Sequence, residues 1–315
     1  METLMLNETE VQSLLDPDML LDALAEGFKA LSEGFVDAPK RNGVTVPNTG
    51  FLLTMPAYQQ GREITVKLVS VFHDNHRFGI PSHQAIICLF DAQTGTPLSF
   101  MDGTYITGLR TAGAAALSTR LLARTDSRVL AIIGAGVQGR AHLKMLPRVR
   151  QFSEIRIASA HFAHAEQLAA TDSRAHAVEV VEQAVRGADI VCLCTHSGEP
   201  VISIDWLSPG MHITSVGYSP PGGELDPKVI EHGHLFVETR MAFEPPPAGC
   251  GELAGFDRRI GNELGEVLLG RGSGRQSQDE ITVYKAMGHA CEDMAAASLV
   301  YRRAKQEGVG RTMVF

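Results

Sequence analysis

The chain has 315 residues and a formal net charge of −8, with 44% hydrophobic and 20% charged residues. This composition is typical of a globular protein of two domains, and its acidic balance argues against a nucleic-acid or anionic-membrane partner. No apolar run approaches the roughly 18 residues that cross a bilayer. The start METLMLNETE lacks the order of a signal peptide, and the five cysteines are scattered. We therefore expect a cytoplasmic protein with a small-molecule substrate.

The first block of predicted elements, to about residue 107, is expected to form an antiparallel sheet with helices. Residues 18–32 follow Pro17 and carry apolar side chains at helical spacing, which predicts an amphipathic helix. Runs bounded by Gly, Asp, Asn and Pro predict strands at 50–56, 64–72, 83–90 and 97–101. The turn at 91–96 is predicted to join the last two strands as a hairpin.

The second block, from about residue 124 to 285, alternates between short strands and helices. Strands are predicted at 128–133, 154–158, 177–181, 190–194, 212–216 and 235–237, with helices at 137–145, 163–171 and 181–187. This alternation is typical of a parallel, doubly wound α/β sheet of the Rossmann type.

The third block, from 281 to about 305, is predicted to be one long amphipathic helix that returns to the first domain. We therefore divide the chain into a Rossmann domain at 113–285 and a second, α+β domain at 1–112 and 286–315.

A glycine turn directly follows the apolar strand at 128–133 and opens a helix, which is the context that a dinucleotide-binding turn requires. Gly134 permits the tight turn, Gly136 lets the backbone approach a pyrophosphate, and Gly139 lets helix and strand pack closely. The predicted phosphate-binding residues are Gly134, Ala135, Gly136, Val137, Gln138 and Gly139. The sequence therefore predicts a nicotinamide dinucleotide cofactor.

The choice between NAD and NADP depends on the end of the next strand. NAD-binding proteins place a carboxylate there to hold the ribose hydroxyls. The segment from Ile157 to His161 carries none, and Ser159 and His161 could donate hydrogen bonds to a 2′-phosphate. No arginine is evident at the strand tip, so both cofactors stay open, with NADP slightly favoured.

The glycine turn and eleven other short segments, in order along the chain, resemble those of the ornithine cyclodeaminase/mu-crystallin family. The matching segments are Met55-Pro56-Ala57-Tyr58, Pro81-Ser82-His83-Gln84-Ala85, Leu89-Phe90-Asp91, Thr94-Gly95, Met101-Asp102-Gly103, Ile106-Thr107, Arg110-Thr111-Ala112, the glycine turn, Val216-Gly217, Glu224-Leu225-Asp226, Lys285-Ala286-Met287-Gly288 and Glu292-Asp293. The resemblance implies redox chemistry at the α-carbon of an amino or imino acid, and a homodimer joined through the non-Rossmann domain. Further predicted cofactor contacts are Thr111, Thr195, Val216 and Gly217.

The family's substrate carboxylate site contains two arginines and a lysine, which the resemblance matches to Arg41, Arg110 and Lys67. Arg110 precedes a small-residue run at 111–116, where we expect a helix N-terminus that would help to bind an anion. Lys67 lies inside a predicted strand, where burial would shift its pKa and let it protonate an imine. His83 is interpreted as a structural histidine rather than a general acid.

Two departures from the cyclodeaminase pattern concern acids that would handle the amine groups of ornithine. Leu53 stands where the cyclodeaminases have one of these acids. Ser219 stands nearest to the position of the other, in the loop after Val216-Gly217. Asp226 and Glu224 are candidate replacement acids, with Asp226 as the candidate catalytic one, although a helix-capping role beside Pro227 is preferred for them.

These departures favour a reductase of small cyclic imino acids, such as pyrroline- or piperideine-2-carboxylate. An ornithine cyclodeaminase, which converts L-ornithine to L-proline and ammonia, is the second hypothesis. A dinucleotide-bound protein without catalysis is the third, and the intact basic set Arg41, Lys67 and Arg110 argues against it. No metal site is predicted, because no histidine pair has a complete ligand set.

Overall fold

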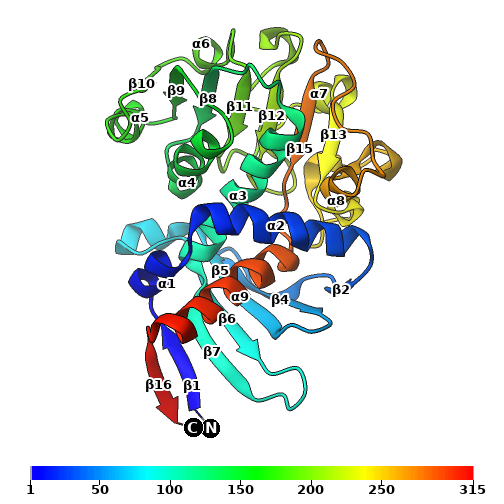
Figure 1. Ribbon diagram of the computed structural model, residues 1–315. Helices are drawn as coiled ribbons and strands as arrows, with labels where there is room; N and C mark the ends of the chain where they lie inside the picture. Colours follow the sequence, from blue (N-terminus) through cyan, green and yellow to red (C-terminus); the bar gives the residue numbers. More distant parts are fainter. Residues whose placement is uncertain (1, 315) are drawn as a thin grey trace. The chain divides into compact units, whose positions relative to one another are not determined.

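The computed structural model describes residues 2–314, apart from the side chains of His73 and His76. The chain divides into two compact units (Figure 1). The first unit contains residues 1–110 with 289–315, and the second contains residues 111–288. No helix in the described part of the chain is both long and apolar enough to span a membrane.

The second unit is built on an eight-stranded sheet in the order β10-β9-β8-β11-β12-β15-β13-β14. All of its strand pairs are parallel, which confirms the doubly wound Rossmann sheet. The strands are β8 Val129–Ile133, β9 Glu154–Ala158, β10 Ala175–Ala177, β11 Ile190–Leu193, β12 His212–Ser215, β13 His234–Val237, β14 Asn262–Glu263 and β15 Thr282–Lys285. The central ones are short and apolar because helices or loops cover both faces of such a sheet.

Helices alternate with these strands. They are α3 Thr104–Leu122, which begins in the first unit, α4 Val137–Met145, α5 Phe162–Ala169, α6 Val181–Val185, α7 Pro227–His232 and α8 Leu264–Leu268. Several begin as the sequence predicts: α4 starts at Val137, directly after the glycine turn, and α7 starts at Pro227. The strand predicted at 177–181 is displaced, because β10 is Ala175–Ala177 and α6 begins at Val181.

The prediction of one long helix from residue 281 onward is wrong for its first residues. Residues Thr282–Lys285 form β15, which pairs with β12 on one side and β13 on the other. Val283 and Tyr284 are fully buried there. Gly288 then adopts φ 72, a conformation that favours glycine and that separates the strand from the next helix. Parallel pairing with β12 and with β13 makes these four residues a strand. A run of four residues is too short to show the alternation of apolar and polar side chains that predicts a strand.

The first unit contains a mixed eight-stranded sheet in the order β16-β1-β7-β6-β5-β4-β2, with β3 also paired to β4. The antiparallel strands β4 to β7 include all four strands that the sequence predicts. The strands are β1 Glu2–Leu6, β2 Val36–Asp37, β3 Asn42–Val46, β4 Gly50–Gln59, β5 Ile64–Phe72, β6 His83–Phe90, β7 Pro97–Asp102 and β16 Arg311–Val314. β1 was not expected, and it runs parallel to β7, so the sheet is not purely antiparallel.

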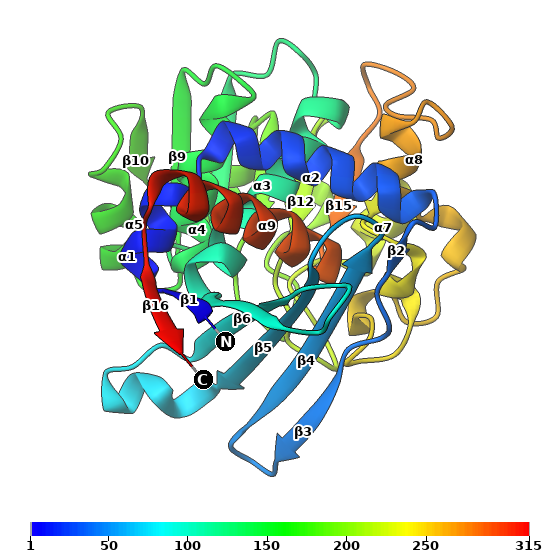
Figure 2. The ribbon, with the colours of Figure 1, turned by 60° about the horizontal axis from the view of Figure 1, so that its bottom comes forward.

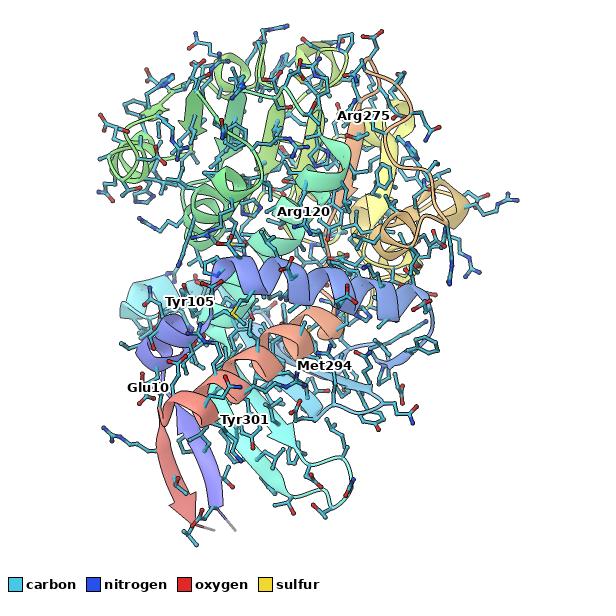
Figure 3. The ribbon with its side chains drawn as sticks, in the orientation of Figure 1. Glu10, Tyr105, Arg120, Arg275, Met294 and Tyr301 are labelled. Carbon is cyan, nitrogen blue, oxygen red and sulfur yellow. The ribbon has the colours of Figure 1, made fainter. Side chains whose placement is uncertain are left out.

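Helices cover one face of this sheet (Figure 2). They are α1 Glu8–Leu14, α2 Pro17–Ser32 and α9 Ala290–Glu307. α2 packs against α9, and α9 in turn lies over β4, β5 and β6. Figure 3 labels Met294 and Tyr301 on α9, which are 0% and 9% exposed. Burial of apolar side chains along α9 therefore fixes the start of this helix over the middle of the sheet.

Candidate active site

A buried group of charged side chains lies in the first unit, between its sheet and the start of α9. Lys67 Nζ, on β5, lies 2.8 Å from Asp293 Oδ2. Arg110 donates from Nε to Asp293 Oδ1 at 3.0 Å and from Nη1 to Glu292 Oε2 at 3.1 Å. All four side chains are at most 4% exposed. Asp293 therefore joins two of the predicted substrate-binding cations in one network.

The pleat of the sheet explains why Lys67 points into this network. Its direct neighbours across the sheet are Met55 on β4 and Ile87 on β6. Side chains opposite one another share a face, and these two are 4% and 0% exposed under α9. Lys67 is thus a lysine on an otherwise apolar, covered face. The first turn of α9 supplies the carboxylates, and the helix dipole favours negative charge there.

The expectation that Arg110 stands beside a helix N-terminus is wrong. α3 begins at Thr104 rather than at residue 111. The Asp102 carboxylate caps it, accepting hydrogen bonds from the backbone N of Thr104 at 3.2 Å and of Tyr105 at 2.8 Å. Arg110 therefore lies inside α3, and its orientation is set by ion pairs with α9 and not by the helix end.

Arg41 lies between β2 and β3 and is partly buried. Its positive charge lowers the pKa of Lys67 and that of His289. The structure thus joins two of the predicted cations, Lys67 and Arg110, on Asp293, and the charge of Arg41 acts on this group. The three cations Arg41, Lys67 and Arg110 outnumber the carboxylates Glu292 and Asp293 by one positive charge.

Burial and neighbouring charge set the protonation of this group. Burial first, and then Arg110, lower the pKa of Lys67 to about 8, while Asp293 opposes the shift. Burial alone would raise the pKa of Asp293, but Arg110 and Lys67 outweigh it, and the pKa is lowered. Asp293 is therefore an anion and Lys67 an ammonium near neutral pH, with a pKa close enough to allow proton transfer.

His83 stands at the start of β6, near this group. Burial, followed by Lys67 and Arg110, lowers its pKa to about 4. A ring that is neutral near pH 7 is a poor acid, so Lys67 is the better proton donor of the two.

The glycine turn of the second unit has the geometry that a dinucleotide requires. Gly134 has φ 112, and a Cβ there would lie 2.4 Å from the carbonyl oxygen of Cys194. A Cβ on Gly139 would lie 2.0 Å from the Gly134 oxygen, so both positions exclude a side chain. A Cβ on Gly136 would meet no described atom within 4 Å. Gly136 therefore borders open space at the start of α4, where backbone N–H groups can bind phosphate.

The other predicted cofactor residues lie at the carboxyl ends of the parallel strands, apart from Thr111 on α3. Ser159 and His161 follow β9, and the ring of His161 stands edge-on to that of His164 at 5.3 Å. Thr195 follows β11, and Val216 and Gly217 follow β12. Ligands bind at this edge in doubly wound sheets.

Glu224 holds part of this edge together and is fully buried. Its carboxylate accepts hydrogen bonds from Thr195 N and Oγ1, both at 2.7 Å, and from Gly217 N at 2.6 Å. Lys285 donates to the Gly217 oxygen at 2.8 Å and pairs with Glu252 at 2.5 Å. Glu224 therefore organises the loops around the predicted cofactor contacts, and the helix-capping role predicted for it is wrong, because Asp226 caps α7.

The family model described as ornithine cyclodeaminase/mu-crystallin family matches residues 1–308. The chain belongs to this family. Ketimine reductase mu-crystallin of Mus musculus is 37% identical, over 94% of this chain and 96% of that protein. Alanine dehydrogenase of Archaeoglobus fulgidus is 32% identical, over 100% and 99%.

Among solved structures of relatives, the Delta(1)-pyrroline-2-carboxylate reductase of Thermococcus litoralis, in complex with NADH and L-proline, superimposes with a TM-score of 0.93. It is 32% identical and covers 99% of this chain and 100% of its own. An archaeal alanine dehydrogenase dimer with bound NAD superimposes with a TM-score of 0.89 at 30% identity, over 100% of both chains.

An apolar side chain, Leu53, lies near Lys67. Leu53 pairs with Val69 across β4 and β5, on the same face as Lys67, and is 7% exposed. It therefore stands on the diagonal from Lys67, at the separation where side chains still influence each other. Ser219, the second departure, lies in the second unit and forms an isolated bridge with Gly222.

Asp226 caps α7 and accepts a hydrogen bond from the backbone N of Lys228 at 2.9 Å. This is the structural role that the sequence analysis preferred for it. Glu292, Asp293 and His289 belong to this group but were not predicted as site residues, although Glu292 and Asp293 carry part of the family resemblance. Two adjacent acids directly before the apolar run at 294–301 were the available signal.

Proposed function

We propose that this protein is an NAD(P)H-dependent reductase of small cyclic imino acids, such as pyrroline-2-carboxylate and piperideine-2-carboxylate. The observation that carries the proposal is the buried Lys67–Asp293 pair beside Arg110, with Leu53 where a diamine would need an acid. One excess positive charge suits a substrate with one carboxylate. Relatives named ketimine reductase and pyrroline-2-carboxylate reductase, one of them in complex with NADH and L-proline, support it.

In this reaction a bound nicotinamide cofactor would supply a hydride to the imine carbon. Arg41 and Arg110 would bind the carboxylate and so orient the imine. The Lys67 ammonium donates a proton to the imine nitrogen, so that the C=N bond becomes a C–H and an N–H bond. Asp293 holds Lys67 in place and supports its charged form before the transfer.

The glycine turn from Gly134 to Gly139 would hold the pyrophosphate, and Thr195 and Gly217, at the carboxyl ends of β11 and β12, would contact the nicotinamide half. We propose that both cofactors are used, with NADPH favoured, because no carboxylate follows β9 to repel a 2′-phosphate. Ser159 and His161 would donate to that phosphate. Solved relatives with bound NADH and NAD support use of the unphosphorylated cofactor as well.

We also propose a homodimer that forms through the first unit. The face of its sheet opposite α9 exposes large apolar side chains, among them Val44 at 66%, Val46 at 45%, Leu52 at 38% and Ile86 at 52%. Val44 and Leu52 pair directly across β3 and β4. An apolar face of this kind is typical of a protein interface. Light scattering on the protein and on Ile86→Glu should show a dimer and a weakened dimer, and a monomeric wild type would contradict this.

The decisive test is turnover with purified protein. NADPH or NADH is mixed with pyrroline-2-carboxylate or piperideine-2-carboxylate, and the loss of absorbance is followed. Ornithine with catalytic NAD, and pyruvate with ammonium and NADH, are parallel reactions. Ammonia and proline from ornithine would establish a cyclodeaminase instead, and faster use of pyruvate would establish an alanine dehydrogenase. Cofactor binding without any turnover would support a binding protein.

A further inference from the structure

His289 is the N-cap residue of α9 and stands against the charged group of the first unit. Its ring Nδ1 accepts a hydrogen bond from Cys291 N at 3.2 Å. Its backbone N donates to Glu292 Oε1 at 2.6 Å, and the other oxygen of Glu292 accepts from Arg110. The side chain is 8% exposed. His289 is thus rigidly held next to a residue of the substrate site.

These contacts determine where the ring carries its proton. Because Nδ1 is an acceptor, the proton of the neutral ring is on Nε2. Burial, and then the charge of Arg41, lower the pKa of His289 to about 4, with Asp293 opposing and Arg110 adding to the shift. The ring is therefore a neutral N–H donor at physiological pH. Within residues 2–314, the described groups offer Nε2 no hydrogen-bond acceptor.

A mere helix cap does not require a histidine. Ser, Asp and Asn are the usual N-cap residues, and histidine is not among them. An aspartate here would cancel the excess positive charge of the neighbouring group. A histidine caps α9 through Nδ1 and leaves a neutral donor on the opposite side of its ring. That donor lies within the field of Arg41 and Arg110, where an anion is the favoured acceptor.

We propose that His289 Nε2–H donates a hydrogen bond to the substrate carboxylate, alongside Arg41 and Arg110. The inference rests on the proposed function, because it takes the substrate to be an imino acid with a single carboxylate. Conjugation with a planar C=N group holds both carboxylate oxygens in the plane of the imine, so fixed donors such as the His289 N–H and the arginines can meet them in a single orientation. His289 is then a specificity-determining residue for the reaction.

The test separates the cap from the donor. His289→Ser keeps a capping side chain but lacks the ring N–H, and His289→Ala lacks both. Binding of pyrrole-2-carboxylate, a flat cyclic carboxylate, is measured by calorimetry on the NADH-saturated protein. The Ser variant should bind it about tenfold or more weakly, as expected for a hydrogen bond to a charged group. Its melting temperature should stay near that of the wild type, whereas the Ala variant should melt lower.

Pyrrole-2-carboxamide is the matched control ligand, because it has the ring but no carboxylate. The Ser variant should lose less affinity for this ligand than for pyrrole-2-carboxylate, because a neutral amide oxygen accepts a weaker hydrogen bond than a carboxylate. Equal binding of pyrrole-2-carboxylate by both proteins would overturn the proposal and leave His289 as a cap alone. A loss of similar size for both ligands would also overturn it, since the ring would then act through shape.

The same measurement distinguishes this inference from the proposed function. A wild type that binds pyrrole-2-carboxylate through His289 but reduces no cyclic imino acid would refute the reductase and retain the carboxylate contact. If the wild type reduces cyclic imino acids and His289→Ser does so with an unchanged KM, the reductase is supported and the carboxylate contact of His289 is refuted. A wild type that binds no carboxylate at all would refute both.

Discussion

Lys67 Nζ and Asp293 Oδ2 lie 2.8 Å apart, one on a strand near the start of the chain and the other on a helix near its end. Neither is exposed by more than 2%. Removing Asp293 leaves the buried Lys67 charge without its counterion, which is far more costly than losing a surface ion pair, whereas Asp293 without Lys67 would keep its ion pair with Arg110. This pair is therefore both the chemical centre of the proposed site and a constraint on its fold.

Replacing Lys67 by Met should lower kcat by about 10²–10⁴-fold, since a positioned proton donor contributes roughly that much. NADH binding, followed by fluorescence, should stay within about twofold of the wild type, because the glycine turn belongs to the second unit. Lys29→Met is the control, because Lys29 forms a surface pair with Glu26. Loss of cofactor binding together with turnover would mean that Lys67 is structural.

The pH dependence of kcat/KM should report the titration of Lys67 in the substrate-free protein. Its pKa is about 8, and the protonated form is the donor. Turnover at low substrate should therefore be insensitive to this group below pH 8 and should fall about tenfold per pH unit above it. A bound substrate carboxylate adds negative charge near Lys67 and so raises its pKa. The decrease of kcat with rising pH should therefore begin at a higher pH than the decrease of kcat/KM. A flat profile to pH 10 would exclude Lys67 as the donor.

Replacing Asp293 by Asn should make kcat/KM begin to fall at a lower pH than in the wild type. Asp293 raises the pKa of Lys67, and its removal leaves burial and Arg110 unopposed. The variant should also lose about 3 kcal/mol of unfolding free energy, as is typical when a buried ion pair loses one member. Urea denaturation measures the second effect, with the exposed Glu26→Gln as control. If kcat/KM begins to fall at the same pH in the variant and in the wild type, Asp293 does not act on the pKa of Lys67.

Alanine at two glycines of the turn should have different effects. Gly139→Ala places a Cβ 2.0 Å from the Gly134 oxygen, so it should disturb folding of the second unit and lower its melting temperature. Gly136→Ala meets no described atom within 4 Å, so the protein should melt normally. It should nevertheless bind NADH about tenfold or more weakly, because the methyl group occupies the space of the pyrophosphate. Normal NADH affinity in Gly136→Ala would argue against this binding mode.

An aspartate in place of Ser159 should reverse the cofactor preference. It restores a carboxylate at the end of β9, which accepts from ribose hydroxyls and repels a 2′-phosphate. The ratio of kcat/KM for NADPH to that for NADH should fall by about tenfold or more. The neighbouring exposed Ala160→Ser should leave the ratio unchanged. An unaltered ratio in Ser159→Asp would show that the 2′-position lies elsewhere.

Much of the fold could be predicted because its signals are local. Periodicity located β5 and β6 to the residue, and the glycine turn located the end of β8 and the start of α4. The wrong assignments have two different causes. β15 is a strand only because β12 and β13, which are distant in sequence, flank it. α3 starts seven residues earlier than expected, because the nearby Asp102 carboxylate satisfies its first N–H groups, a local signal that was missed.

The sequence by itself determined that a dinucleotide-binding turn opens a Rossmann sheet, because glycine's conformational freedom and the strand–turn–helix order are local properties. It also indicated the basic residues of the substrate site, through resemblance. Only the tertiary structure decided that Lys67 and Arg110 share Asp293, and that His289 presents a neutral N–H beside them. Burial and charge from several elements set these protonation states, and no spacing along the chain encodes such a sum.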